Sequence, residues 1–277
     1  MNNLRFLTKT GDLYRHILLI ILIGLMLFPY GITFIISGKS IPQFYDAPFK
    51  ITLPFYWSNY KEAWEEIKFY LRNSIIVSGF SVIGVVVMSV LSAYAFARYK
   101  FPGREVLYYL VISLLMIPGV LTLIPSFMLV KYLGLLNTRW ALFLPYISGG
   151  QVFAIFILRS FFASIPTDYF DAARIDGASE LQILRHVTLP LSWSIIGVVA
   201  VMNVLGTWND LIWPLVTLQD TRLYTLTVGL YNFRNSYYTV WGPLMAGYII
   251  GSIPLIILFI FTSKLFVEGL ASGAIKM

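Results

Sequence analysis

Six apolar stretches, each long enough to cross a lipid bilayer, dominate this sequence. About 20 consecutive apolar residues span the hydrocarbon core of a membrane as a helix. The six stretches are 17–36, 74–96, 106–130, 142–162, 193–216 and 243–266. Because lipid offers backbone groups no hydrogen-bonding partner, such stretches are expected to be helical. We therefore predict an all-α integral membrane protein with six transmembrane helices in a single domain over 1–277.

The composition agrees with this class. Hydrophobic residues make up 58% of the chain and charged residues 12%, whereas a soluble domain carries about 25% charged residues. The first stretch is too long for the apolar part of a cleavable signal peptide, so we expect it to remain as a span. With no cysteine and only two histidines, the sequence predicts neither disulfides nor a metal site.

The net charge of +7 does not indicate nucleic-acid binding, because the basic residues are spread through short loops. They fit better with the excess of Lys and Arg found in cytoplasmic loops. Two basic groups flank the early spans: Arg5, Lys9 and Arg15 before the first, and Arg98, Lys100 and Arg104 after the second. We therefore expect both termini inside, the segment 37–70 outside and a loop at 164–190 inside.

A polar segment, 168–190, separates the fourth and fifth apolar stretches. Thr167 is placed to cap a first short helix, and Gly177 can adopt the left-handed conformation that ends it. Ser179 can cap a second helix and form a capping box with Gln182, three residues later. The sequence thus predicts two short helices joined at Gly177.

This polar segment resembles the EAA loop in the membrane subunits of ABC importers. Three blocks carry the resemblance: Asp171-Ala172-Ala173, Asp176-Gly177-Ala178 and Leu189-Pro190. Further matching stretches are LRNSIIVSG, AYAFARYKFPGRE, FFASIPTDYFDAARIDGAS, GTWNDLIWPL and the tail LFVEGLASGAIKM. Together they make 71–277 similar to the carbohydrate-importer branch, of the maltose-permease type, whereas 37–70 carries little of this signal.

The resemblance implies a permease subunit that moves a sugar, an oligosaccharide or a related polyol by alternating access across the cytoplasmic membrane of a prokaryote. It implies a second permease subunit in a heterodimer, two ATPase subunits and an extracytoplasmic solute-binding protein. ATP and Mg²⁺ would belong to the ATPase, so no cofactor and no catalytic residue are expected on this chain.

The resemblance also implies a set of loop residues that couple the permease to the ATPase. They are Asp171, Ala172, Ala173, Asp176, Gly177, Ala178, Leu184 and Pro190. Ala172 and Ala173 would offer a small, smooth surface, and Asp171 would meet a basic residue of the partner while also facing Arg174 three residues on. For Asp176, capping of the turn before Gly177 is favoured over a partner contact.

Polar and aromatic residues in the spans are candidates for the substrate pathway. A charged group in the membrane normally faces protein or water because lipid does not solvate it. The candidates are Asn203, Trp208, Asn209, Asp210, Gln151 and Tyr146. The alternative is that Asn209 and Asp210 cap the outer end of a helix, and that Trp208 and Trp213 belong to the aromatic belt at the membrane surface.

Other residues in the spans predict packing and kinks. Small residues at four-residue spacing form two rows, Ser89/Ala93/Ala97 and Gly247/Gly251, which predict seams within the subunit or against a partner permease. Five prolines are placed to kink or break spans: Pro118, Pro125, Pro145, Pro214 and Pro254.

A stand-alone secondary transporter or channel for a small polar solute is the main alternative function. Such transporters often consist of two repeated halves, and the first and last three spans of this chain show no clear similarity. A membrane enzyme is disfavoured because no paired acid and base, nucleophile or metal cluster appears in the sequence.

Overall fold

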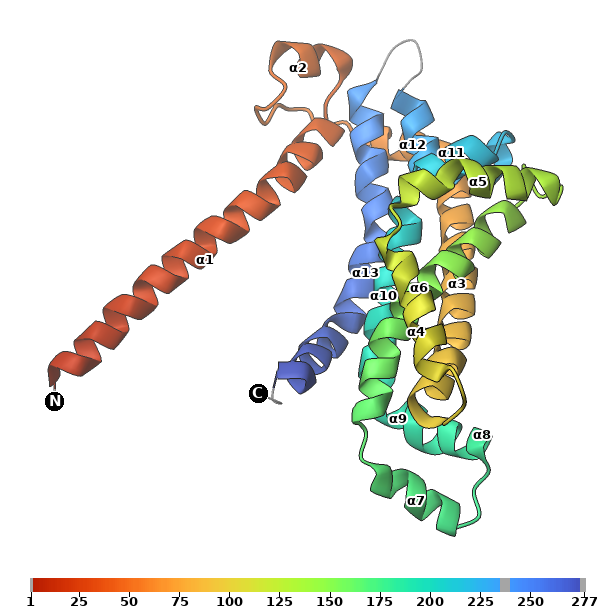
Figure 1. Ribbon diagram of the computed structural model, residues 1–277. Coiled ribbons are helices and arrows are strands. Elements are labelled where there is room, and N and C mark those ends of the chain that lie inside the picture. Colours follow the sequence, from red (N-terminus) through yellow and green to blue (C-terminus); the bar gives the residue numbers. More distant parts are fainter. Residues whose placement is uncertain (1, 235–239, 275–277) are drawn as a thin grey trace. The chain divides into compact units, whose positions relative to one another are not determined.

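The structure is a computed structural model that describes residues 2–234 and 240–274, and every regular element in this part of the chain is helical (Figure 1). The all-α prediction is therefore confirmed. The chain forms two compact units. Unit 1 contains Met1–Ile67 and Leu230–Ile253, and unit 2 contains Lys68–Gly229 and Pro254–Met277. Unit 2 holds the polar segment 168–190 and all the candidate pathway residues.

Four helices in the described part of the chain can each cross a membrane by length and composition. They are Leu13–Ser37 within α1 (Asn2–Ser37), α3 (Ser58–Arg98), α6 (Trp140–Ser164) and Trp241–Leu265 within α13 (Trp241–Ala274). Two bent pairs of helices raise the number to six when each pair counts as one span. The first pair falls on the third predicted span. The second pair joins Glu180–Leu191 to Trp193–Asn209, so its 79° bend lies at Ser192, directly before the fifth predicted span.

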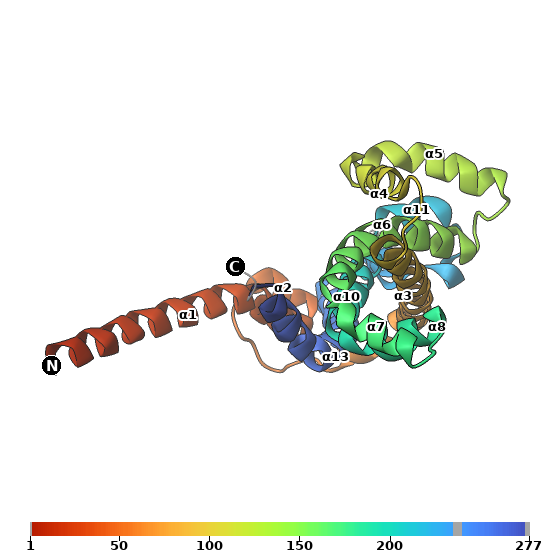
Figure 2. The same ribbon diagram turned by 60° about the horizontal axis from the view of Figure 1, so that its bottom comes forward.

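The third predicted span, 106–130, bends by 103° in its middle. Its first half is α4 (Arg104–Ser113) with the 3₁₀ turn η1 (Leu114–Met116), and its second half is α5 (Gly119–Tyr132). Pro118 disfavours the helical conformation in the residue before it, and Ile117 is accordingly extended, with φ −86° and ψ 114°. Figure 2 shows the resulting change of direction between α4 and α5.

The fifth predicted span, 193–216, is interrupted near its outer end. α10 (Trp193–Asn209) stops at Asp210, and α11 (Ile212–Thr217) begins after Leu211. Pro214 explains the break, because it has no N–H to donate to the carbonyl four residues earlier, which belongs to Asp210. Pro125, Pro145 and Pro254 instead lie inside helices that continue past them.

Two buried clusters form the core of unit 2. One joins α3, α6 and α10 with the loop 164–190, and its members include Val85, Ala93, Tyr94, Leu158, Phe162, Phe170, Ile183, Ile196 and Val199. The other includes Val77, Val130, Ala141, Leu142, Phe143, Trp213 and Leu218. Ser89 and Ala93 are fully buried and Ala97 packs against the first cluster. The first predicted row of small residues is therefore a seam within this subunit.

Unit 1 contains an ordered segment after α1. Lys39 is only 2% exposed, and its Nζ donates to Ala47 O, Lys50 O and Thr52 Oγ1 at 2.9, 2.6 and 3.0 Å. Burial lowers the pKa of Lys39, and the charge of Asp46 opposes part of that effect. The short helix α2 (Ile41–Asp46) follows. Residues 39–52 of the segment 37–70 are thus folded around a buried lysine, a feature that the sequence does not reveal.

Candidate functional site

The loop 164–190 begins with the short helix α7 (Thr167–Ile175). Gly177 has φ +79°, the left-handed conformation predicted for the end of this helix. Thr167 does not cap α7, so that prediction is wrong: Pro166 occupies the N-cap position with φ −55° and ψ 139°, and Thr167 is already helical. An N-cap residue has an extended backbone, and the fixed φ of proline allows that conformation, so the helix begins directly after Pro166.

The second piece begins as predicted, with Ser179 as the N-cap of α8 (Glu180–Ile183) and Gln182 completing the capping box. It continues as a π-helix, η2 (Leu184–Thr188), and ends in α9 (Leu189–Leu191). Pro190 lies within this run. A proline would clash with the carbonyl four residues before it in a regular α-helix, and the wider π-turn relieves that clash. π-turns are frequent at functional sites.

One face of this loop is part of the core. Phe170 and Ile183 are each 1% exposed, and Leu184 is buried beside them. Ala173 and Ala178 pack against the same cluster. Three of the eight predicted coupling residues therefore face the protein interior: Ala173, Ala178 and Leu184. The other five are exposed: Asp171, Ala172, Asp176, Gly177 and Pro190.

The outward face of the loop carries large apolar side chains that sequence reasoning missed. Ile175 is 87% exposed, Leu181 is 71% exposed and Tyr169 is 55% exposed. They accompany the exposed Ala172 on the same two short helices. Their signal in the sequence was faint, because single apolar residues in a polar segment are as readily buried as exposed. Figure 1 shows α7 to α9 at one end of unit 2, with α5 and α11 at the other.

A short network of charges crosses the turn at Gly177. Arg174 contacts Asp171 at 3.4 Å, as its spacing predicted, and Glu180 at 3.1 Å. The hydrogen bond to Glu180 and the nearby carboxylates raise the pKa of Arg174. The carboxylate of Asp176 forms no hydrogen bond within the described residues, so Asp176 does not cap the turn through its side chain as predicted. The residue is exposed.

The candidate pathway residues fall into two places. The Tyr146 hydroxyl on α6 donates to Asp210 Oδ2 at 2.9 Å, and Asp210 Oδ1 accepts the Trp213 N–H at 3.3 Å. Asp210 thus caps the helix break, as one alternative predicted. Asn209 is exposed, and its side chain donates to Leu205 O at 2.8 Å.

Deeper along α10, Asn203 lies against α6. Its Nδ2 donates to Val199 O at 2.9 Å. A Cβ added to Gly150 would lie 2.2 Å from Asn203 Oδ1, so this glycine makes room for the amide. Gln151, the next residue on α6, is half-buried.

The two tryptophans are buried. Trp208 and Trp213 are 6% and 7% exposed, and Trp213 Nε1 donates to Ala141 O at 2.9 Å. Their burial disfavours the alternative that they belong to the membrane-surface belt, because packing inside unit 2 supplies the apolar contact for both and a hydrogen-bond acceptor for Trp213. Among the described residues, no group of three His, Asp or Glu side chains is placed to hold a metal ion.

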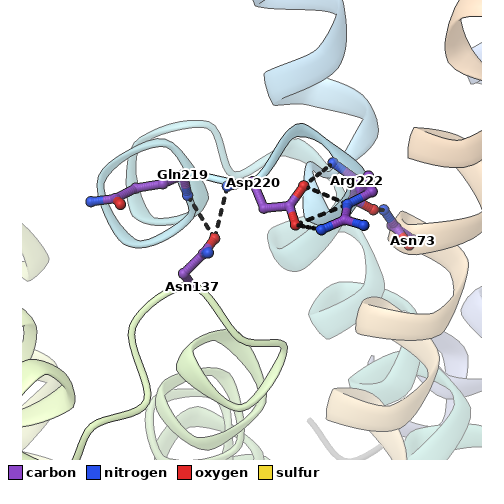
Figure 3. Close-up of polar contacts among 5 residues, drawn as sticks. All are labelled: Asn73, Asn137, Gln219, Asp220 and Arg222. Atoms are coloured by element: carbon purple, nitrogen blue, oxygen red, sulfur yellow. Dashed lines mark hydrogen bonds and ion pairs between the residues drawn. The ribbon is translucent and has the colours of Figure 1, made fainter.

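Sequence reasoning also missed a polar network beyond α11 (Figure 3). Asn137 has φ 58°, and its Oδ1 accepts the N–H groups of Gln219 and Asp220 at 3.0 and 2.8 Å. Asp220 binds the guanidinium of Arg222 through both carboxylate oxygens, which lowers the pKa of Asp220. Asp220 Oδ1 also accepts the backbone N–H of Arg222 at 2.9 Å, which caps the 3₁₀ turn η3 (Thr221–Leu223).

Asn73 on α3 completes this network. Its Nδ2 donates to Arg222 O at 2.7 Å and to Tyr224 O at 3.0 Å, while its Oδ1 accepts from Arg139 at 3.1 Å. The network joins the segment after α11 to α3 and to the connection between α5 and α6. Because its members are far apart in the chain, no local motif marks them.

Residues 84–271 match the family described as "Binding-protein-dependent transport system inner membrane component". The chain is 33% identical to the trehalose/maltose transport system permease protein MalG of Thermococcus litoralis, over 96% of this chain and 98% of the relative. It is 32% identical to the diacetylchitobiose uptake system permease protein NgcG of Streptomyces coelicolor, over 94% and 88%. These relatives are transport permeases rather than enzymes.

A solved structure has the same fold. It is that of a bacterial ABC transporter involved in the import of the acidic polysaccharide alginate, with a TM-score of 0.82, 23% identity and coverage of 92% of this chain and 96% of that one. The match thus extends over nearly the whole length of both chains. This chain belongs to the family of inner-membrane components of binding-protein-dependent transport systems.

Proposed function

We propose that this permease subunit moves a sugar, an oligosaccharide or a related polyol by alternating access, driven by ATP hydrolysis in a separate subunit that docks on the loop 164–190. The substrate class is supported by the names of the relatives, which transport diacetylchitobiose, trehalose and maltose, arabinooligosaccharides or sn-glycerol-3-phosphate. Because these relatives are permease components of transport systems, the alternative of a stand-alone secondary transporter or channel is disfavoured.

The outward face of the loop is the observation that carries the docking proposal. Ile175, Leu181 and Tyr169 present apolar surface around the small Ala172. Exposed apolar patches mark interaction sites when polar residues surround them. Asp171 and Asp176 supply negative charge at the edge of this face, which suits a partner cleft with basic residues.

The remaining partners follow from the same family. A second permease subunit, different from this one, would complete the pathway, and two ATPase subunits would bind ATP and Mg²⁺. The alginate transporter has been solved in complex with an alginate pentasaccharide-bound periplasmic protein, which supports an extracytoplasmic solute-binding protein as the partner on the other side. This arrangement requires the loop 164–190 and both termini in the cytoplasm, and segment 37–70 outside.

Two loop variants test the docking. Ile175→Glu places a charge in the apolar face, and Asp171→Lys reverses a charge at its edge. Both should insert into the membrane normally but lose the copurifying ATPase and the transport activity. Ile51→Glu is the matched control, because Ile51 is 82% exposed on segment 37–70. Retention of bound ATPase and substrate-stimulated hydrolysis in both loop variants would refute the proposal.

A further inference from the structure

Arg98, the last residue of α3, contacts the loop 164–190, although α3 is not adjacent to this loop in the sequence. Its Nη2 donates to Ile165 O at 2.7 Å and also to Phe162 O. Its guanidinium carbon lies 3.6 Å from the centroid of the Phe170 ring on α7. Arg98 therefore contacts the end of α6 and the first helix of the loop with one side chain.

These contacts suit an arginine for three physical reasons. The last carbonyls of a helix lack partners inside it, and a cation near them is stabilising. A flat guanidinium can donate to two acceptors and stack on an aromatic face at the same time. Phe170 is 1% exposed, so the stack is shielded from water. A lysine could not form the same combination of contacts.

A second contact from α3 reaches the other helix of the loop. The Tyr94 hydroxyl donates to Glu180 Oε2 at 2.8 Å, while Glu180 Oε1 contacts Arg174 of α7. Tyr94 lies one turn before Arg98, on the same side of α3. Consequently α3 contacts α7 and α8, although neither helix is near it in the sequence.

The loop's covalent connections alone would transmit its movement poorly to α3. The chain enters the loop from α6 and leaves it through a 79° bend into α10. Flexing at either junction could absorb a displacement of the loop before it reached the spans. We propose that Arg98 and Tyr94 fix the loop to α3, so that α3 moves with the loop when a bound ATPase displaces it. This inference rests on the proposed function of the loop.

A coupling measurement tests the role of Arg98. The variant Arg98→Lys keeps the positive charge and loses the stacking on Phe170 together with the paired hydrogen bonds to Phe162 O and Ile165 O. In the full assembly reconstituted in lipid vesicles, it should retain bound ATPase and ATP hydrolysis, whereas substrate moved per ATP hydrolysed should fall about tenfold. Tyr94→Phe should lower the same ratio in the same direction. An unchanged ratio in both variants would overturn the proposal.

Arg159→Lys is the matched control. The Arg159 guanidinium carbon lies 3.7 Å from the Tyr108 ring, and the side chain donates to Glu105 of α4 rather than to the loop. The control should keep the native ratio. If Arg98→Lys fails to insert, Phe170→Leu decides the question, because it retains an apolar side chain at this buried site and removes only the ring under the guanidinium.

A distance measurement separates this inference from the docking proposal. The chain contains no cysteine, so spin labels can be attached at Leu91→Cys on α3 and Arg185→Cys on η2, both exposed positions. In the otherwise native assembly the distance between the labels should be the same without nucleotide and in the nucleotide-trapped state. With Arg98→Lys it should differ between the two states.

The two proposals fail in different ways. If the loop does not dock the ATPase, Ile175→Glu will leave the ATPase bound. If the loop docks the ATPase but α3 does not move with it, Ile175→Glu will still release the ATPase. The distance between the two spin labels will then change with nucleotide even when Arg98 is present.

Discussion

The hydroxyl of Tyr146 and the carboxylate of Asp210 form a 2.9 Å hydrogen bond that ties α6 to the point where α10 ends. Asp210 uses its other oxygen to accept the N–H of Trp213 in α11. One carboxylate therefore connects three helices and satisfies a backbone donor at the break before Pro214. This role of Asp210 is structural.

Tyr146→Phe should destabilise the protein by about 1.5–3 kcal/mol, because it removes a hydrogen bond to a charged group. Thermal unfolding of the detergent-purified protein measures the effect. Tyr132→Phe serves as the control, since Tyr132 is 87% exposed. Equal melting temperatures for the two variants would show that the Asp210 bond contributes nothing to stability.

Water access along α10 should depend on the state of the transporter. Cysteines introduced by Asn203→Cys and Asn209→Cys have no native thiol background. With a charged, membrane-impermeant thiol reagent, Asn209→Cys should react in every state because Asn209 is exposed. Asn203 lies about 9 Å from Asn209 along α10, further from its outer end, at about 1.5 Å per residue. Labelling of Asn203→Cys should therefore change when nucleotide traps the assembly. Constant labelling at Asn203 would assign it to helix packing alone.

Gly177→Ala should destabilise the loop by about 1–3 kcal/mol, because a non-glycine residue is strained in the left-handed conformation. No neighbouring atom lies within 4 Å of the added Cβ, so the effect is purely conformational. Gly103→Ala is a matched comparison with φ +77° and equally open surroundings. Gly24→Ala, in an open position within α1, should instead be neutral or stabilising. Melting temperatures of the three variants check this prediction: they should fall for Gly177→Ala and Gly103→Ala but not for Gly24→Ala.

The Asn137 side chain should protect two backbone amides. Asn137→Gly keeps the left-handed backbone and removes the acceptor, so hydrogen exchange at Gln219 and Asp220 should become faster. Asn137→Asp retains an acceptor oxygen and should exchange at nearly the native rate. If Asn137→Gly leaves exchange unchanged, the protection comes from burial of the segment and not from this hydrogen bond.

Local chemistry explains the parts of the fold that could be predicted. Long apolar runs indicated the spans, and Gly177, Ser179 and Gln182 each specify a conformation through interactions with residues no more than four positions away. The prediction failed at Thr167 because Pro166, its immediate neighbour, already supplies a helix start. The breaks of the third and fifth spans at Pro118 and Pro214 were predicted for the same reason, because a proline disturbs the helix only within about four residues of itself.

The sequence by itself thus determined the class of the protein, the resemblance that identifies its family and the turn chemistry of the loop. Only the tertiary structure decided which face of the loop is exposed, that Trp213 is buried, and that Arg98 lies on Phe170. It also brought Asn137 to Asp220 across 83 positions of sequence. Periodicity and capping report interactions within a few residues, whereas these contacts depend on how helices distant in the chain pack together.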